Sequence, residues 1–152
     1  ERRVRSGTAM VALAAGFAAA ARSAVDDLAQ EAARLQSLRT RLVGGITSRV
    51  PDVRVNGSAP TSAAILNVTF RGCRADDLLL ILDAAGIDCS TGSACTAGVH
   101  QPSEDLLARG RSQPDASASL RFSLGRGSSA AAIDRVLGVL PEAVVRARSA
   151  AL

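Results

Sequence analysis

A run of small residues surrounds one of the three cysteines of this chain. The run is Ser90–Gly98, with the sequence STGSACTAG, and Cys95 lies near its middle. Small side chains let the backbone bend and let another molecule approach closely. A thiol on such a loop suits nucleophilic attack or group transfer, in which it must reach first a substrate and then an acceptor. Cys95 is therefore the candidate nucleophile.

A candidate binding residue lies in a later stretch that alternates in polarity. The sequence SLRFSL at positions 119–124 is typical of a strand, and it places Arg121 on the face opposite to Leu120 and Phe122. A planar guanidinium donates two parallel hydrogen bonds to a carboxylate, which a lysine cannot do. Arg121 is therefore a candidate carboxylate ligand, and a surface ion pair is the alternative.

The other cysteines and the one histidine do not suggest a metal site. Cys89 and Cys95 are six positions apart, no CxxC pair exists, and His100 is the only histidine. We expect Cys73 and Cys89 to pack in the core or at the end of a strand, and His100 to lie in a solvated loop. Three unpaired cysteines fit free thiols in a reducing compartment, so we expect a cytoplasmic protein.

Composition limits the classes of partner. The chain has 152 residues, enough for one domain, with 47% hydrophobic and 2% aromatic residues and a net charge of +4. It has no Trp or Tyr to stack on bases, so we expect no nucleic-acid partner. The apolar stretch at positions 9–21 is too short to cross a bilayer, so we expect no membrane span.

Long helical patterns open the chain, from about position 8 to position 49. The segment 9–28 is apolar on nearly every side, whereas 27–50 is amphipathic. A helix that is apolar all round needs burial on more than one side. We therefore divide the chain into residues 1–30, a linker and first helix that would pack on a missing domain or a partner subunit, and residues 31–152, a small domain.

The remaining patterns predict short alternating elements. Gly86 stands where a glycine commonly ends a helix. The expected class is α+β, a small, mostly antiparallel sheet with helices on one face. The patterns predict strands at 53–55, 64–70, 87–90 and 119–124, helices at 76–85, 102–108 and 128–147 (interrupted at Pro141), and a loop at 111–117.

Several of these segments together resemble one known family. They occur in that family's order and at matching spacings, and they span nearly the whole chain. By this pattern the chain resembles the C-terminal portion of the NifS/IscS-like cysteine desulfurases, in the class V aminotransferase family. The matching segments are Glu1–Thr8 (ERRVRSGT), Ala64–Phe70 (AILNVTF), Ser90–Thr96 (STGSACT), Gln101–Ser103 (QPS) and Leu120–Arg126 (LRFSLGR).

The resemblance implies a function and roles for three residues. The family consists of dimeric, fold type I enzymes that use pyridoxal phosphate to take sulfur from L-cysteine, leaving L-alanine. By the match, Cys95 accepts the sulfur as a persulfide and Arg121 holds the substrate carboxylate. Thr8 reaches the cofactor phosphate of the opposite subunit, and it is also a candidate helix N-cap.

The resemblance also implies partners. The persulfide would pass to a sulfur-acceptor protein for iron–sulfur cluster or thio-cofactor assembly. An iron–sulfur scaffold, a tRNA-modifying carrier and another thiol all remain open as acceptors, and selenocysteine remains open as a substrate.

One feature departs from the family: all 18 basic residues are arginine, so the chain contains no lysine. Pyridoxal phosphate enzymes hold their cofactor through a lysine amine. We therefore expect these residues to be the C-terminal part of a longer enzyme whose cofactor domain is missing here. Alone, the chain is expected to be inactive and to bind no cofactor. The alternative is a noncatalytic sulfur-carrier or interaction module that accepts a persulfide from a separate subunit.

Overall fold

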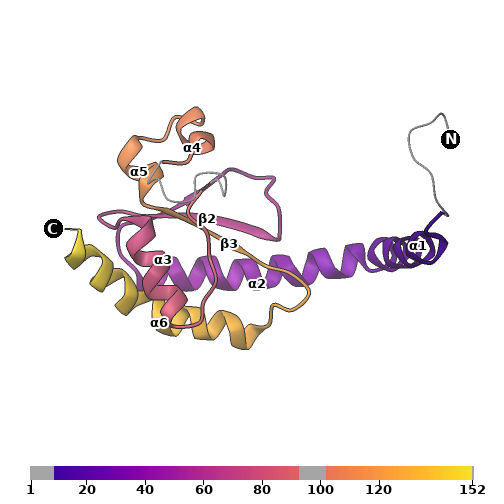
Figure 1. Ribbon diagram of the computed structural model, residues 1–152. Helices are drawn as coiled ribbons and strands as arrows, with labels where there is room; N and C mark the ends of the chain where they lie inside the picture. Colours follow the sequence, from indigo (N-terminus) through magenta and orange to yellow (C-terminus); the bar gives the residue numbers. More distant parts are fainter. Residues whose placement is uncertain (1–8, 93–101, 152) are drawn as a thin grey trace.

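A small sheet with long helices on one side forms the body of the protein (Figure 1). The computed structural model describes residues 9–92 and 102–151. The element order is α1, α2, β1, β2, α3, α4, α5, β3, α6. Figure 1 shows α2, α3 and α6 below the strands and the two short helices α4 and α5 above them. The predicted α+β class is confirmed.

The sheet has three strands in the order β1-β2-β3, and both pairs are antiparallel. The strands are β1 (Val53–Asn56), β2 (Ile65–Phe70) and β3 (Ser119–Ser123). Side chains alternate between the two faces of a strand. Leu120 and Phe122 are accordingly buried while Arg121 between them is exposed, as the sequence predicts.

The core lies between the apolar face of the sheet and helices α2 (Leu28–Arg49), α3 (Ala75–Ala84) and α6 (Ala130–Ala150). Burying one such aliphatic or aromatic side chain contributes about 1.5–3 kcal/mol. This layer therefore holds the strands, and the residues on their other face, in fixed register. Its most buried members are Leu42, Ile46, Leu66, Val68, Phe70, Leu78, Leu82, Leu120, Leu140 and Val144.

Helices α2 and α6 approach each other closely at Gly45. A Cβ atom added at Gly45 would overlap the Leu137 side chain of α6, whereas one added at Gly44 would meet nothing within 4 Å. Arg34 of α2 also donates to the backbone oxygens of Gly125 and Ser128, at 3.0 and 2.6 Å. These contacts join α2 to both ends of the β3–α6 connection.

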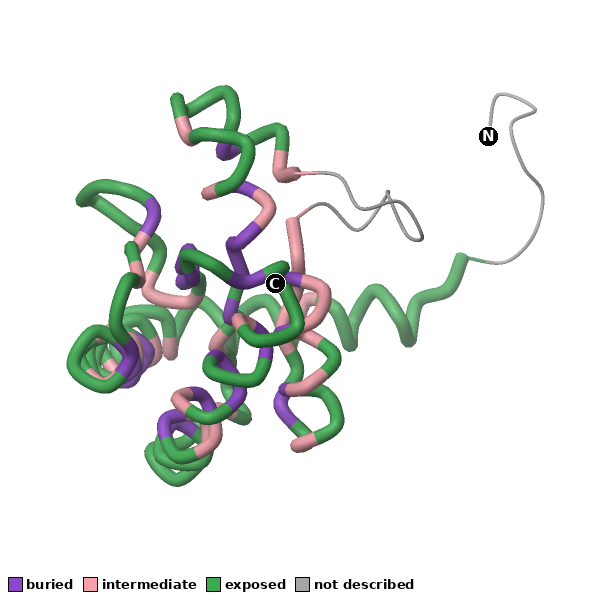
Figure 2. The backbone as a smooth tube through the Cα atoms, turned by 90° about the vertical axis from the view of Figure 1, so that its left-hand side faces the viewer, coloured by how far each residue is buried: buried purple, intermediate pink, exposed green. Residues whose placement is uncertain are grey.

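Helix α1 (Val11–Asp26) has no buried residue. It extends away from the body, and Figure 2 shows it exposed along nearly its whole length. Phe17 is 77% exposed, and Leu13 and Val25 are 64% and 70% exposed. The expectation that this segment packs on other protein stays a prediction, as does the division at residue 30.

Three local predictions are wrong. Residues 87–90 form no strand, because only Ser90 pairs with β3, through an isolated bridge to Arg121. The segment predicted as loop contains α5 (Gln113–Ser117), which begins with Ser112 accepting a hydrogen bond from the backbone N–H of Asp115. Pro141 does not interrupt α6, since buried residues on both sides of it hold the helix against the core.

Three predicted helices are confirmed. Helix α3 ends before Gly86, whose φ of +72° is the left-handed conformation that glycine adopts readily. Helix α4 spans Glu104–Ala108, within the predicted range. Ser129 caps α6, accepting a hydrogen bond from the backbone N–H of Ala132 at 3.2 Å.

Candidate functional site

The face of the sheet opposite the long helices is polar, and it carries the predicted ligand Arg121. In the strand register, Asn56 of β1 lies opposite Asn67 of β2, and Asn67 lies opposite Arg121 of β3. Side chains at directly opposed positions are near neighbours on one face. The three therefore form a row that crosses the sheet and ends at the arginine.

The backbone of Arg121 also anchors the segment that leads toward Cys95. Ser90 N–H donates to the Arg121 carbonyl at 3.0 Å, and Arg121 N–H donates to the Ser90 carbonyl at 2.8 Å. This bridge extends the row by one residue beyond β3. It fixes Ser90 beside the predicted carboxylate ligand, close to where the described segment ends at Gly92.

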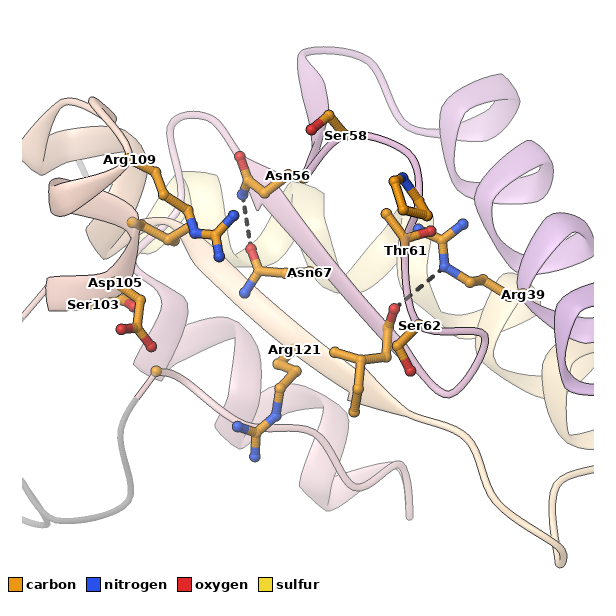
Figure 3. A pocket seen from close by; sticks show the side chains of 15 residues that line it. Arg39, Asn56, Ser58, Thr61, Ser62, Asn67, Ser103, Asp105, Arg109 and Arg121 are labelled. Carbon is orange, nitrogen blue, oxygen red and sulfur yellow. Dashed lines mark hydrogen bonds between the residues drawn. The ribbon is translucent and has the colours of Figure 1, made fainter. Parts of the chain in front are cut away.

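A cavity of about 540 Å³ lies over this face (Figure 3). Three arginines line it, Arg39, Arg109 and Arg121, against a single lining carboxylate, Asp105. The segment before the 93–101 gap also reaches the cavity, because Gly92 is among the lining residues. A cavity with this excess of guanidinium groups favours an anionic ligand.

Two of these arginines are free to bind a ligand. Arg39 donates its Nε–H to the Ile65 carbonyl at 3.3 Å. Within residues 9–92 and 102–151, the side chains of Arg109 and Arg121 have neither a hydrogen bond nor an ion pair. The surface ion pair considered for Arg121 is therefore not formed with the described part of the chain.

A buried hydrogen-bond network lies beside the row on the same face of the sheet and includes Asn56. Asn56, Thr69 and Ser119 are 8%, 0% and 3% exposed. Asn56 Nδ2 donates to Asn67 Oδ1 at 2.7 Å and to Thr69 Oγ1 at 2.8 Å. Thr69 Oγ1 lies 2.8 Å from Ser119 Oγ, which donates to the Asp115 carbonyl at 2.7 Å. Asn56 Oδ1 is buried without a partner among the described residues, a loss of about 1–3 kcal/mol.

The two described cysteines are not activated thiols. Burial raises the pKa of Cys73, whose Sγ lies 3.8 Å from the Val144 carbonyl. Burial, reinforced by Asp88 and Asp83, raises the pKa of Cys89 to about 11. Cys73 belongs to the core and Cys89 packs against it, as predicted. Both thiols stay protonated near neutral pH, so neither is prepared to attack.

Several predicted residues lie outside the described part of the chain. These are the candidate nucleophile Cys95, the candidate phosphate contact Thr8, and His100. Of the three candidate site residues, the structure therefore places only Arg121.

Sequence reasoning missed Asn56, Asn67, Asp105 and Arg109 as residues of the site. One signal was present: asparagine is unfavourable inside strands, yet Asn67 interrupts an otherwise apolar and β-branched run. A polar residue that breaks such a pattern marks the face that carries chemistry. Arg109 and Asp105 gave no comparable signal, because a charged residue in a short helix is ordinarily a solvated one.

Comparison with known proteins identifies the family. A family model described as Aminotransferase class-V matches residues 1–136. The chain belongs to the class-V aminotransferase family.

Relatives of this class-V aminotransferase chain are cysteine desulfurases. An IscS-like cysteine desulfurase from Mycobacterium tuberculosis is 54% identical over 154 residues, covering 100% of this chain and 39% of that protein. The cysteine desulfurase IscS of Methanosarcina thermophila is 39% identical over 151 residues, covering 98% of this chain and 37% of that protein. The chain thus spans less than two fifths of the length of these relatives.

Solved structures show the same fold. A NifS-like protein is similar to this chain with a TM-score of 0.78 and 27% identity, over 95% of this chain and 36% of that one. The NifS-like protein from Rickettsia africae has a TM-score of 0.75 at 24% identity, over 92% of this chain and 36% of that one.

Membership of this family implies dependence on pyridoxal phosphate in the full-length protein. Enzymes of this kind hold the cofactor through a lysine amine and a partner for the ring nitrogen. None of the 152 residues is a lysine. The chain by itself therefore does not fit a pyridoxal phosphate site, whereas its arginine-lined cavity fits an anionic group such as a carboxylate.

The described residues offer neither a metal site nor a membrane-spanning helix. There, no three or more His, Cys, Asp or Glu side chains gather in a way that could hold a metal ion. In the same residues, no helix combines the length and the apolar character needed to cross a membrane.

Proposed function

We propose that this chain is the C-terminal part of a pyridoxal phosphate-dependent cysteine desulfurase. The observation that carries the proposal is the position of Arg121. Its guanidinium is unpaired by the described residues, it lines an arginine-rich cavity, and its backbone anchors the segment before Cys95. The cysteine desulfurases among the relatives support the same reaction class.

In this proposal Arg121 binds the carboxylate of L-cysteine and Cys95 accepts its sulfur. The C–S bond of the substrate breaks and an S–S bond forms at Cys95, so L-cysteine and a thiol become L-alanine and a persulfide. The substrate carbon is reduced while the two sulfurs are oxidised, so no external oxidant or reductant is needed. The cofactor, when bound, supplies the electron sink that labilises the substrate.

The distance that Cys95 must cover is compatible with this role. Five residues span at most about 18 Å. Ser90 is hydrogen-bonded to the backbone of Arg121, and the Cα of Cys95 can be no farther than this distance from the Cα of Ser90. A thiol tethered in this way can serve the substrate and then an acceptor at the surface.

Residues 1–30 would connect this domain to the rest of the enzyme. We propose that α1 packs on the cofactor domain or on the partner subunit of a homodimer, since its apolar side chains are exposed here. Thr8 would contact the cofactor phosphate of the opposite subunit, a role that rests on the family resemblance. The persulfide would pass to an acceptor protein such as an iron–sulfur scaffold in the cytoplasm.

The absence of lysine favours a second candidate function. A chain that cannot hold the cofactor could act as a sulfur carrier, accepting a persulfide on Cys95 from a separate subunit. The upstream reading frame separates the two: a continuous frame that encodes a cofactor lysine supports the desulfurase, and a start codon close to Glu1 supports the carrier.

The test of the proposed function is Arg121→Lys in the full-length protein, with L-alanine formation from L-cysteine as the assay. Lysine keeps the charge but loses the bidentate geometry, so we expect the KM for L-cysteine to rise about 10- to 100-fold. Arg54→Lys is the matched control, because Arg54 is an exposed arginine in β1 that does not line the cavity. No L-alanine formation by the unmodified protein, or equal KM values for both variants, would reject the proposal.

A further inference from the structure

The hydrogen bonds beside the cavity run in one direction, from Asn56 of β1 through Thr69 to Ser119. The backbone carbonyl of Asp115 can only accept, so the Ser119 hydroxyl proton points toward it. The 2.8 Å contact between Thr69 Oγ1 and Ser119 Oγ then requires the Thr69 proton. Thr69 is left as an acceptor, and it must receive a proton from the Asn56 side chain.

Because each of these hydrogen bonds has a fixed donor, the side-chain amides of Asn56 and Asn67 each have only one possible orientation. Asn56 directs its nitrogen inward, and its two N–H groups go to Thr69 Oγ1 and Asn67 Oδ1. Asn67 therefore presents its oxygen to Asn56. Its own nitrogen, with two donor protons, lies on the other side of the amide, away from Asn56. Figure 3 shows Asn67 in this orientation, between Asn56 and Arg121.

This orientation of the Asn56 amide is unfavourable for its oxygen atom. Asn56 Oδ1 is buried without a partner among the described residues. Turning the Asn56 amide over would place its oxygen against Asn67 Oδ1 and Thr69 Oγ1, both of which act as acceptors here. Asn67 could follow only by turning its own oxygen toward the arginine. The present arrangement instead gives the cavity an amide donor next to the guanidinium.

We propose that Asn67 Nδ2 is a second donor to the substrate carboxylate beside Arg121, and that Asn56 is the residue that positions it. The inference rests on the proposed function, since it takes the ligand to be the carboxylate of L-cysteine. Asn67 is half-buried and lines the cavity, and it lies directly opposite Arg121. A carboxylate has two oxygens and accepts from several donors at once, which a guanidinium and an amide together provide.

The first test uses Asn67→Ala and Asn67→Asp in the full-length enzyme, with KM and kcat measured for L-cysteine. We expect Asn67→Ala to raise KM about tenfold, with a smaller change in kcat, because the lost bond is to a charged acceptor. Asn67→Asp keeps the oxygen that Asn56 needs but places a negative charge beside Arg121, so KM should rise further. Ser123→Ala, an exposed residue on the same face of β3, is the control and should leave KM unchanged.

Two inhibitors isolate the carboxylate. 3-Mercaptopropionate carries a thiol and a carboxylate without an amine, and its inhibition constant should rise in parallel with KM in the Asn67 variants. Cysteamine carries a thiol and an amine without a carboxylate, and its inhibition constant should not change. A purely structural defect would weaken both inhibitors, and that outcome would overturn the proposal.

The second test asks whether Asn56 acts through Asn67. Asn56→Ala should raise KM several-fold in the otherwise unmodified enzyme, and it should add nothing when Asn67 is already alanine. Full additivity of the two substitutions would reject the positioning role. Unmodified enzyme that turns over L-cysteine while both Asn67 variants keep its KM would overturn this inference and leave the proposed function intact. Unmodified enzyme without turnover would instead reject the proposed function.

Discussion

At the scale of the residue, the environment of each group separates the candidate ligand from the inert thiols. Arg121 is exposed, unpaired by the described residues and aligned with a polar row, so its guanidinium is available to an anion. Cys73 and Cys89 are held in or against the core, where burial disfavours the thiolate. Under the proposed function, Cys95 is therefore the cysteine that would accept the sulfur.

The pKa of Cys89 gives a prediction about its reactivity. Only the thiolate is alkylated, so the rate of iodoacetamide modification at Cys89 should rise with pH and reach half its maximum near pH 11, the value to which its pKa is raised. In the denatured protein the midpoint should fall to about 8.5. Mass spectrometry of the modified peptide measures the rate, and a native midpoint close to the denatured one would contradict this account.

The free energy of unfolding should also depend on the protonation of the Cys89 thiol. Because the folded pKa of Cys89 lies above its ordinary value, the folded state holds the proton more tightly. Its contribution to stability is fully present below about pH 8.5 and is lost as the pH rises toward 11.

The residue scale also shows what the sequence could reveal. The alternation around Arg121 predicted the face on which this side chain lies, because strand periodicity is local. The role of Asn67 could not be predicted in this way. Its amide direction depends on Asn56, Thr69 and Ser119, three positions from three strands that meet only after folding.

At the scale of the element, helix packing sets the position of the polar row. The strands are held by α2, α3 and α6, and α2 approaches α6 closely at Gly45, which leaves room for Leu137. The register that aligns Asn56, Asn67 and Arg121 thus depends on contacts made on the opposite face of the sheet.

The adjacent glycines of α2 provide a matched test of this packing. Gly45→Ala would force the buried Leu137 aside and should lower the free energy of unfolding by about 1–3 kcal/mol. Gly44→Ala adds a methyl group to open space and should stabilise the helix by up to ~1 kcal/mol. Denaturant unfolding of the two variants measures the difference, and equal effects would show that the close approach is unimportant.

Elements were predictable where local signals agree with tertiary contacts. Helix α3 with Gly86 and helix α6 with Ser129 carry their own start and stop signals. Pro141 predicted a break in α6, but the burial of Leu140 and Val144 on either side of it keeps the helix continuous. At positions 87–90 the pattern suggested a strand, but pairing with β3 stops after a single bridge, which no local pattern could indicate.

At the scale of the whole molecule, the first helix presents several large apolar side chains to solvent. Apolar residues that project from a body in this way ordinarily mark an interaction site. Since this chain covers 39% of its relative from Mycobacterium tuberculosis, the remaining protein is the proposed partner for α1.

Substitution at Phe17 tests that proposal. In the full-length protein, Phe17→Asp should remove a buried contact and lower stability by roughly 1.5–3 kcal/mol, with a shift of any dimer toward monomer. Gln30→Asp is the control, because Gln30 is an exposed polar residue beside the same helix junction. Thermal unfolding and sedimentation measure the two effects. If Phe17→Asp behaves like Gln30→Asp, then α1 is a solvent-exposed helix in the full-length protein as well.

The central claim of this account is that Cys95 receives sulfur from L-cysteine. The most direct measurement is mass spectrometry of the full-length protein after brief exposure to L-cysteine. Cleavage at Arg74 and Arg109 leaves Cys89 and Cys95 in one tryptic peptide, so fragmentation of that peptide must locate the added sulfur. The account predicts one extra sulfur atom on Cys95, none on Cys89, and loss of the adduct in Cys95→Ser. An adduct on Cys89, or an unmodified peptide from enzyme that is producing L-alanine, would contradict it.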